Sequence, residues 1–144
     1  KGMPIGSFHS FLSMAEDEAK SQTPEPPNVL NMYLLGKVCE DFKKKGIAAI
    51  KKETYEKAEL LYDYFDANPA HQPFVQEKEV RSDTVIVVNA PQGSKQIISK
   101  LKENGVVVGS GYAEYKDSQI RIANFPAHGM KGMKHLLDEF SKIS

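Results

Sequence analysis

The sequence predicts an α+β fold, with a small, mainly antiparallel sheet of three or four strands, helices packed on one face, and a long connector helix in front. Three observations lead to this prediction. Apolar residues recur every four positions at 30, 34, 38 and 42, which is typical of an amphipathic helix. A β-branched run covers 84–89, and an alternating pattern covers 119–124. Helical patterns lie between and after these strands, so the predicted order from residue 29 is α-α-β-α-β-β-α.

The N-terminal part predicts a short helix and an extended loop. Residues 8–20 mix aromatic and charged side chains in an amphipathic helical pattern. Residues 21–28 read Ser-Gln-Thr-Pro-Glu-Pro-Pro-Asn. Because each proline fixes φ and removes an amide donor, this segment predicts an extended linker or binding loop. The chain starts with Lys-Gly-Met-Pro and no initiator methionine, so we expect a piece of a longer protein.

Two helices are predicted before the first strand. Asn28 suits the N-cap of the first, and Gly46 ends it. Its apolar stripe is wide enough to be buried between two bodies, as a connector between domains requires. The second helix ends at Asn68-Pro69, and its lysines and glutamates at 51–59 are expected to form a solvated outer face. Its inner face is expected to contain Ile47, Ile50, Thr54, Ala58, Leu61 and Phe65.

The rest of the chain predicts the sheet and its other helices. The unbroken β-branched run at 84–89 indicates a strand that is buried on both faces. Ser94 is expected to cap a helix that Asn104-Gly105 ends. The segments that follow are predicted to be a strand at 106–108, a flexible loop at 109–111, a strand at 119–124 and a helix at about 130–143.

Composition bounds the classes of function. The chain has 144 residues with 19 basic and 19 acidic side chains, so it has the size of one domain and no net charge to attract nucleic acid. Cys39 is the single cysteine, and no apolar segment is long enough to span a bilayer. We therefore expect a soluble cytoplasmic protein that binds neither nucleic acid nor membrane.

The strand at 119–124 carries the candidate binding residue. Ile120 and Ile122 share one face because strand side chains alternate, so Arg121 points the opposite way. A guanidinium fixed on a rigid strand suits recognition of a carboxylate through two hydrogen bonds. The alternative is an arginine on a solvated sheet face, and the local sequence alone favours that alternative.

No complete catalytic apparatus is visible. The segment Gly109-Ser110-Gly111 does not open into a helix, so it is a weak signal for phosphate binding. Ser110 has no neighbouring base that would make it a nucleophile. No second histidine, cysteine or carboxylate stands at metal-site spacing from His9, and the other three histidines, at 71, 128 and 135, are scattered, so no metal site is predicted.

The order of several motifs resembles a known family. These are Gln22-Thr23-Pro24, the helix that begins Asn28-Val29-Leu30-Asn31-Met32-Tyr33-Leu34-Leu35-Gly36, Arg81-Ser82 before a strand, and Gln119-Ile120-Arg121-Ile122-Ala123-Asn124-Phe125-Pro126. Together they are similar to the C-terminal part of the phosphoserine aminotransferases, which are class V, fold-type I enzymes dependent on pyridoxal phosphate. The resemblance covers most of the chain and implies the small domain of such an enzyme.

The resemblance also implies roles for individual residues. Thr23, with Gln22 beside it, would bind the cofactor's phosphate in the active site of a partner subunit, since these enzymes are homodimers. Arg121 would bind the substrate's α-carboxylate, and Asn124 would support that corner of the site. Residues 1–28 would be a remnant of the large cofactor domain with a proline-rich loop, and 29–144 would be the connector helix and small domain. The implied reaction transfers an amino group between glutamate and a 3-phosphooxy-2-oxo acid, a step of serine biosynthesis.

Two departures from the family pattern stand out. The first concerns the lysine that forms the Schiff base with the cofactor, which has no counterpart motif here because Lys1 lacks the surrounding pattern. We therefore expect the isolated chain to be inactive and not to bind pyridoxal phosphate covalently.

The second concerns the histidine-arginine pair with which many members bind the substrate's phosphate. This sequence has Gly-Ser-Gly-Tyr at 109–112 in its place, and Lys116 is the candidate substitute. Two alternatives stay open: a free-standing α+β module that binds a small ligand or regulates, and another class V aminotransferase activity.

Overall fold

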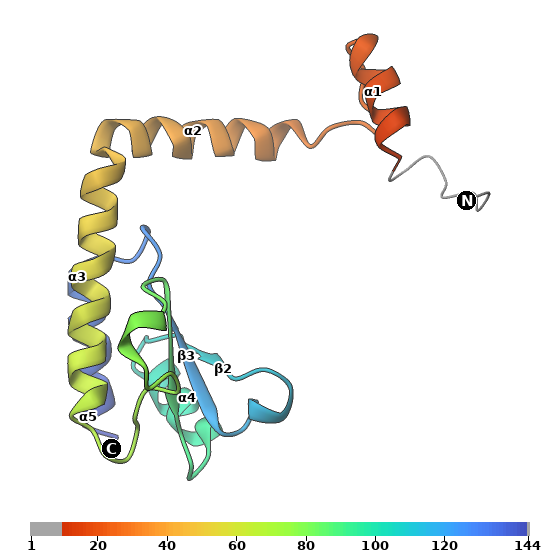
Figure 1. Cartoon of the computed structure of the whole chain (residues 1–144). Coiled ribbons are helices and arrows are strands. Elements are labelled where there is room, and N and C mark those ends of the chain that lie inside the picture. The colour runs from red at the N-terminus through yellow and green to blue at the C-terminus, as the bar shows by residue number, and fades with distance from the viewer. Residues whose placement is uncertain (1–9, 144) are drawn as a thin grey trace. The chain divides into compact units, whose positions relative to one another are not determined.

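The computed structural model describes residues 10–143 and confirms the predicted fold class (Figure 1). The predicted first helix was expected to start at residue 8, which lies outside the described residues. The chain divides into two compact units between Lys44 and Lys45. The domain boundary expected at residue 28 stays a prediction. Within the described residues, no helix combines the length and the apolarity needed to cross a membrane.

The first unit consists mainly of two helices. Helix α1 (Phe11–Ala19) is capped by Ser10, and the chain leaves it through Ser21, which has φ 55°. Helix α2 (Val29–Lys45) starts as predicted, with the Asn28 Oδ1 accepting a hydrogen bond from the Asn31 amide at 3.0 Å. Neither helix contains a buried residue. The apolar stripe of α2 was expected to be buried, but within the described residues nothing covers it. The following α2 side chains are exposed: Val29, Leu30, Met32, Tyr33, Leu34, Leu35 and Val38.

The second unit contains the sheet. Its three strands are arranged in the order β1-β3-β2, and both outer strands run antiparallel to β3. In this register Arg121 lies between Val87 of β1 and Gly109 of β2. The elements are α3 (Ile47–Asp66), β1 (Val85–Asn89), α4 (Ser94–Glu103), β2 (Gly109–Ser110), β3 (Gln119–Ala123) and α5 (Met130–Ser141).

One face of the sheet forms the core. Alternate residues of β1 and β3 are buried against helices α3, α4 and α5, and Figure 1 shows α3 and α5 lying along the same side of the sheet. The rings of Phe65 on α3 and Phe140 on α5 meet edge to face at 5.1 Å. Burial of β1 on both faces was expected, but Val85, Val87 and Asn89 are only half-buried because the helices cover one face. The core contains Leu61, Phe65, Ile86, Val88, Leu101, Ile120, Ile122, Leu137 and Phe140.

The second strand and one helix cap differ from the prediction. The strand expected at 106–108 is wrong, because the residues that pair with β3 are Gly109 and Ser110. Val106 instead packs into the core and Val107 is exposed. Ser94 is the first residue of α4 and not its cap, since Gly93 holds the cap position. The Ser94 hydroxyl donates to the Lys116 carbonyl at 3.1 Å, which attaches the β2–β3 loop to the helix.

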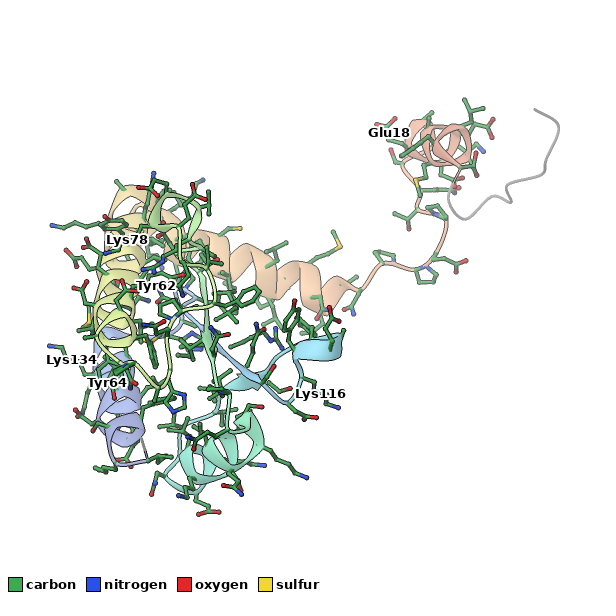
Figure 2. The ribbon with its side chains drawn as sticks, turned by 60° about the horizontal axis from the view of Figure 1, so that its bottom comes forward. Glu18, Tyr62, Tyr64, Lys78, Lys116 and Lys134 are labelled. Carbon is green, nitrogen blue, oxygen red and sulfur yellow. The ribbon has the colours of Figure 1, made fainter. Side chains whose placement is uncertain are left out.

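Arg81, which belongs to one of the family-like motifs, stabilises the segment between α3 and β1. Its guanidinium makes two hydrogen bonds of 2.8 Å to the Asp66 carboxylate and lies 4.6 Å from the ring of Tyr62. Figure 2 labels Tyr62 on α3 near Lys78, which pairs with the same carboxylate at 3.6 Å. The hydrogen bonds from Arg81 lower the pKa of Asp66. This arginine is therefore occupied by structural partners.

Candidate functional site

Arg121 occupies the middle of β3, on the sheet face opposite the core, as its alternation with Ile120 and Ile122 predicts. Its Nε donates a hydrogen bond to the Ser110 carbonyl at 2.6 Å. The carbon at the centre of its guanidinium lies 3.7 Å from the centroid of the Tyr112 ring. Among the residues that the structure describes, no carboxylate pairs with Arg121 and no acceptor bonds its two terminal nitrogens. The side chain is therefore fixed, and part of its binding capacity is unused.

This geometry suits a bidentate anion site. The Nε bond and the tyrosine ring fix the plane of the guanidinium, and the two terminal nitrogens are the donors that grip a carboxylate. An unpaired cation on a rigid strand loses little conformational entropy when a ligand arrives. The arrangement favours binding over the alternative of an arginine that is merely solvated.

The segment 109–115 is an ordered platform for Arg121, although 109–111 was expected to be a flexible loop. A Cβ on Gly109 would come within 3.2 Å of a terminal nitrogen of Arg121, so the glycine makes room for the guanidinium. The Gly111 amide donates to the Gln119 carbonyl at 3.0 Å, which extends the pairing beyond β2. A 3-10 turn (Ala113–Tyr115) follows, with Ala113 at φ 45°. This turn places Tyr112 against the arginine.

Replacing Gly111 with alanine is expected to destabilise the chain by about 1–3 kcal/mol, because the added Cβ would overlap the Tyr115 carbonyl oxygen and carbon. Both atoms belong to the backbone, so the turn itself has to move. Urea denaturation measures the change in the free energy of unfolding. The matched control is Gly132→Ala on α5, where a Cβ meets nothing within 4 Å and the helix gains about 0.5–1 kcal/mol. Equal effects of the two substitutions would contradict the tight turn.

Asn124 lies just past the end of β3 and is fully buried. Its Nδ2 donates to the carbonyls of Thr54 on α3 and Asp83 before β1, both at 2.8 Å. Its backbone amide donates to the Thr84 carbonyl at 2.8 Å. These bonds join the end of the Arg121 strand to the neighbouring helix and strand. The contacts are those of a supporting residue, and a role in substrate binding stays a prediction.

Lys57 is a residue whose role the sequence analysis missed. It was expected on the solvated face of α3, but its side chain is fully buried. The ammonium group donates to the carbonyls of Phe125 at 3.2 Å and His128 at 2.5 Å, in the turn between β3 and α5. Burial lowers the pKa of Lys57. Its spacing was an available signal, because position 57 lies three residues after Thr54 and four before Leu61 on the inner face.

Gln22 and Thr23 lie in the first compact unit, whereas Arg121 belongs to the second. Both are exposed in the irregular segment that follows α1 and its turn. The Gln22 amide donates to the Asp17 carbonyl at 2.8 Å, and the Thr23 hydroxyl donates to the Glu25 carbonyl at 2.7 Å. Lys116 is exposed on the β2–β3 loop, where Figure 2 shows it away from α3 and α5. No cluster of three or more metal-ligating side chains occurs among residues 10–143.

Comparison with known proteins identifies the family. Residues 11–129 match the family model of the class-V aminotransferases. The chain belongs to this family. Among curated relatives, the phosphoserine aminotransferase of Nocardioides sp. is 26% identical over 129 residues, which cover 88% of this chain and 34% of that protein. The phosphoserine aminotransferase of Acinetobacter baumannii is 25% identical over 136 residues. The chain thus spans about a third of the length of the relatives that it matches.

Solved structures extend this result to three dimensions. A phosphoserine aminotransferase from Cytophaga hutchinsonii matches 96% of this class-V chain and 38% of its own length, with a TM-score of 0.86 and 38% identity. An alanine–glyoxylate aminotransferase from Nostoc sp. matches 87% of this chain and 34% of its own, with a TM-score of 0.70 and 19% identity. The second likeness concerns the fold alone. Aminotransferases with different names therefore share this fold.

The side chains of Thr23 and Gln22, which are expected to bind the phosphate of pyridoxal phosphate, have the chemical groups for that role. A phosphate takes hydrogen bonds from hydroxyl and amide groups, and the exposed Thr23 hydroxyl and Gln22 carboxamide supply both. The Thr23 hydroxyl has to leave the Glu25 carbonyl to reach a ligand. Residues 21–28 include no lysine or arginine, so Gln22 and Thr23 would be neutral donors to a phosphate.

Proposed function

We propose that this chain is the C-terminal domain of a pyridoxal-phosphate-dependent aminotransferase that acts on phosphoserine and 2-oxoglutarate. The observation that carries the proposal is Arg121, which is fixed by Ser110 and Tyr112 while its terminal nitrogens have no partner among the described residues. Both proposed substrates contain the α-carboxylate that such a fork binds. The similarity to phosphoserine aminotransferases supports the substrate pair.

The parts of the chain have separate roles in this proposal. Arg121 orients the substrate by its carboxylate, and Asn124 supports the end of its strand. Thr23 and Gln22 hold the cofactor's phosphate in the site of a partner subunit of a homodimer. When bound, pyridoxal phosphate would supply the electron sink for the amino transfer, while these residues would hold and orient the reactants. Residues 1–28 belong to the cofactor domain, and 29–144 form the connector and small domain. The enzyme works in the cytoplasm.

The proposal assigns the covalent lysine to a part of the protein outside this chain, so the isolated chain is inactive. The test is an assay of the full-length protein for phosphoserine-dependent conversion of 2-oxoglutarate to glutamate. Turnover is the expected result. No turnover with any amino donor would contradict the enzyme and favour the ligand-binding or regulatory module.

A second candidate is another class-V amino-transfer activity. It is supported by the segment 109–112, which has no histidine-arginine pair for the substrate's phosphate, and by the fold shared with an alanine–glyoxylate aminotransferase. In the first proposal, by contrast, Lys116 on the β2–β3 loop would bind the substrate's phosphate in place of that pair. Turnover with alanine and none with phosphoserine would favour the second candidate.

A further inference from the structure

We propose that Tyr112 is a positioning residue for the substrate site, because its ring holds the Arg121 guanidinium in the orientation that receives a carboxylate. This inference rests on the proposed function, in which Arg121 binds the α-carboxylate. It adds a residue that determines how well that clamp works. The ring would set the affinity for every substrate that has an α-carboxylate.

Two contacts and a glycine define the position of the guanidinium. The Tyr112 ring covers one side, with the central carbon 3.7 Å from the ring centroid. The Ser110 carbonyl accepts from Nε at 2.6 Å. Gly109 leaves the guanidinium its space, because a Cβ built there would lie 3.2 Å from a terminal nitrogen. The Ser110 contact comes from the backbone, so the tyrosine ring is the part of this arrangement that a side-chain substitution removes.

The backbone around Tyr112 fixes the position of its ring. Tyr112 is 71% exposed, and burial in a core therefore does not hold it. The backbone around it is tightly wound instead, since Gly111 leaves no room for a Cβ, Ala113 has φ 45°, and the Tyr115 amide donates to the Tyr112 carbonyl at 2.9 Å. Unfavourable backbone conformations persist where the surroundings enforce them, and they gather at functional sites. The turn keeps an exposed aromatic ring on the arginine.

The energetic consequence concerns substrate binding. An arginine side chain that is free to rotate loses entropy when it grips a ligand, whereas a guanidinium already stacked on a ring has lost it beforehand. The ring touches the arginine and not the reacting atoms. Both halves of the proposed amino transfer use the same carboxylate clamp, so loss of the ring raises KM for the amino donor and for the 2-oxo acid by the same factor and leaves kcat unchanged.

The experiment compares four variants of the full-length protein in steady-state kinetics with phosphoserine and 2-oxoglutarate. Tyr112→Leu and Tyr112→Ala remove the aromatic face, and each is expected to raise both KM values about three- to fivefold, the range that an exposed cation–π contact supports. Tyr112→Phe keeps the face and is expected to match the wild type. Tyr115→Ala is the matched control, because its ring leaves the same turn but packs on Phe74 at 5.4 Å.

The outcomes separate this inference from the proposed function. Unchanged KM values in Tyr112→Leu and Tyr112→Ala, or a Tyr112→Phe variant as impaired as Tyr112→Ala, would overturn the role of the ring. A rise in only one of the two KM values would also overturn it. An Arg121→Met variant measured in parallel tests the clamp itself. If Arg121→Met raises the KM of both substrates while Tyr112→Ala does not, the proposed function stands and the inference about the ring fails. Normal kinetics in Arg121→Met would overturn both.

Discussion

Arg121→Met in the full-length protein is expected to lower kcat/KM for phosphoserine and for 2-oxoglutarate by about two orders of magnitude. Methionine keeps an unbranched side chain on the strand but removes the fork and its charge. The substrate then loses both its anchor and its orientation toward the reacting centre. Steady-state kinetics measures the change. The kcat/KM of Arg121→Lys is expected to lie between those of the wild type and Arg121→Met, because an ammonium keeps the charge without the planar pair of donors.

The control for charge is Lys100→Met, which removes an exposed cation from α4. It is expected to leave kcat/KM unchanged. Thermal unfolding of Arg121→Met is expected to stay close to the wild type, since the substitution removes one hydrogen bond and one exposed ring contact, each worth about 1 kcal/mol. An Arg121→Met enzyme with the kinetics of Lys100→Met would show that the fork does not bind substrate.

Lys57→Met is expected to destabilise the chain by about 3 kcal/mol, as estimated for two buried acceptors left without a donor. The Phe125 and His128 carbonyls accept from the Lys57 ammonium, and methionine fills a similar volume without any hydrogen. Urea denaturation measures the loss in the free energy of unfolding. Lys51→Met, on the exposed side of the same helix, is the control and is expected to change that free energy by less than about 0.5 kcal/mol.

The same substitution has a pH signature. Burial lowers the pKa of Lys57 in the folded chain below its ordinary value of 10.5. Between the lowered pKa and 10.5 the unfolded chain binds more protons at this residue than the folded chain, so the residue's contribution to the free energy of unfolding increases with pH. Below that window the contribution is constant. The difference in stability between wild type and Lys57→Met is therefore expected to widen as pH rises through the window, and a constant difference would contradict a buried, titrating lysine.

Local patterns were sufficient where a residue's surroundings follow from its neighbours along the chain. The four-residue apolar spacing predicted α2, and Asn28 predicted its cap. The alternation around Arg121 predicted which side of β3 it occupies. These features depend on helix and strand periodicity, which is a local property of the chain. The predicted order of elements from residue 29 was correct for the same reason.

Local patterns gave wrong predictions at positions whose partners come from segments distant in the sequence. A run of valines predicted a strand at 106–108, yet β3 pairs with the two residues that follow, and a Cβ on Gly109 in that register would lie 3.2 Å from a terminal nitrogen of Arg121. A lysine predicted solvent at position 57, yet two carbonyls 68 and 71 residues further along the chain receive its hydrogen bonds. A charged side chain is buried only when its partners are supplied, and the sequence around it does not display them.

The sequence by itself determined the α+β class, the long helix before the sheet, and an arginine on the strand face opposite the core. Its motif order also indicated the aminotransferase family that residues 11–129 match. Only the tertiary structure decided that the arginine is fixed and unpaired among the described residues, that Tyr112 covers it, and that Lys57 and Asn124 hold the chain just beyond its strand. Periodicity fixes the side of an element from which a residue projects, whereas its partners are set by segments brought together only on folding.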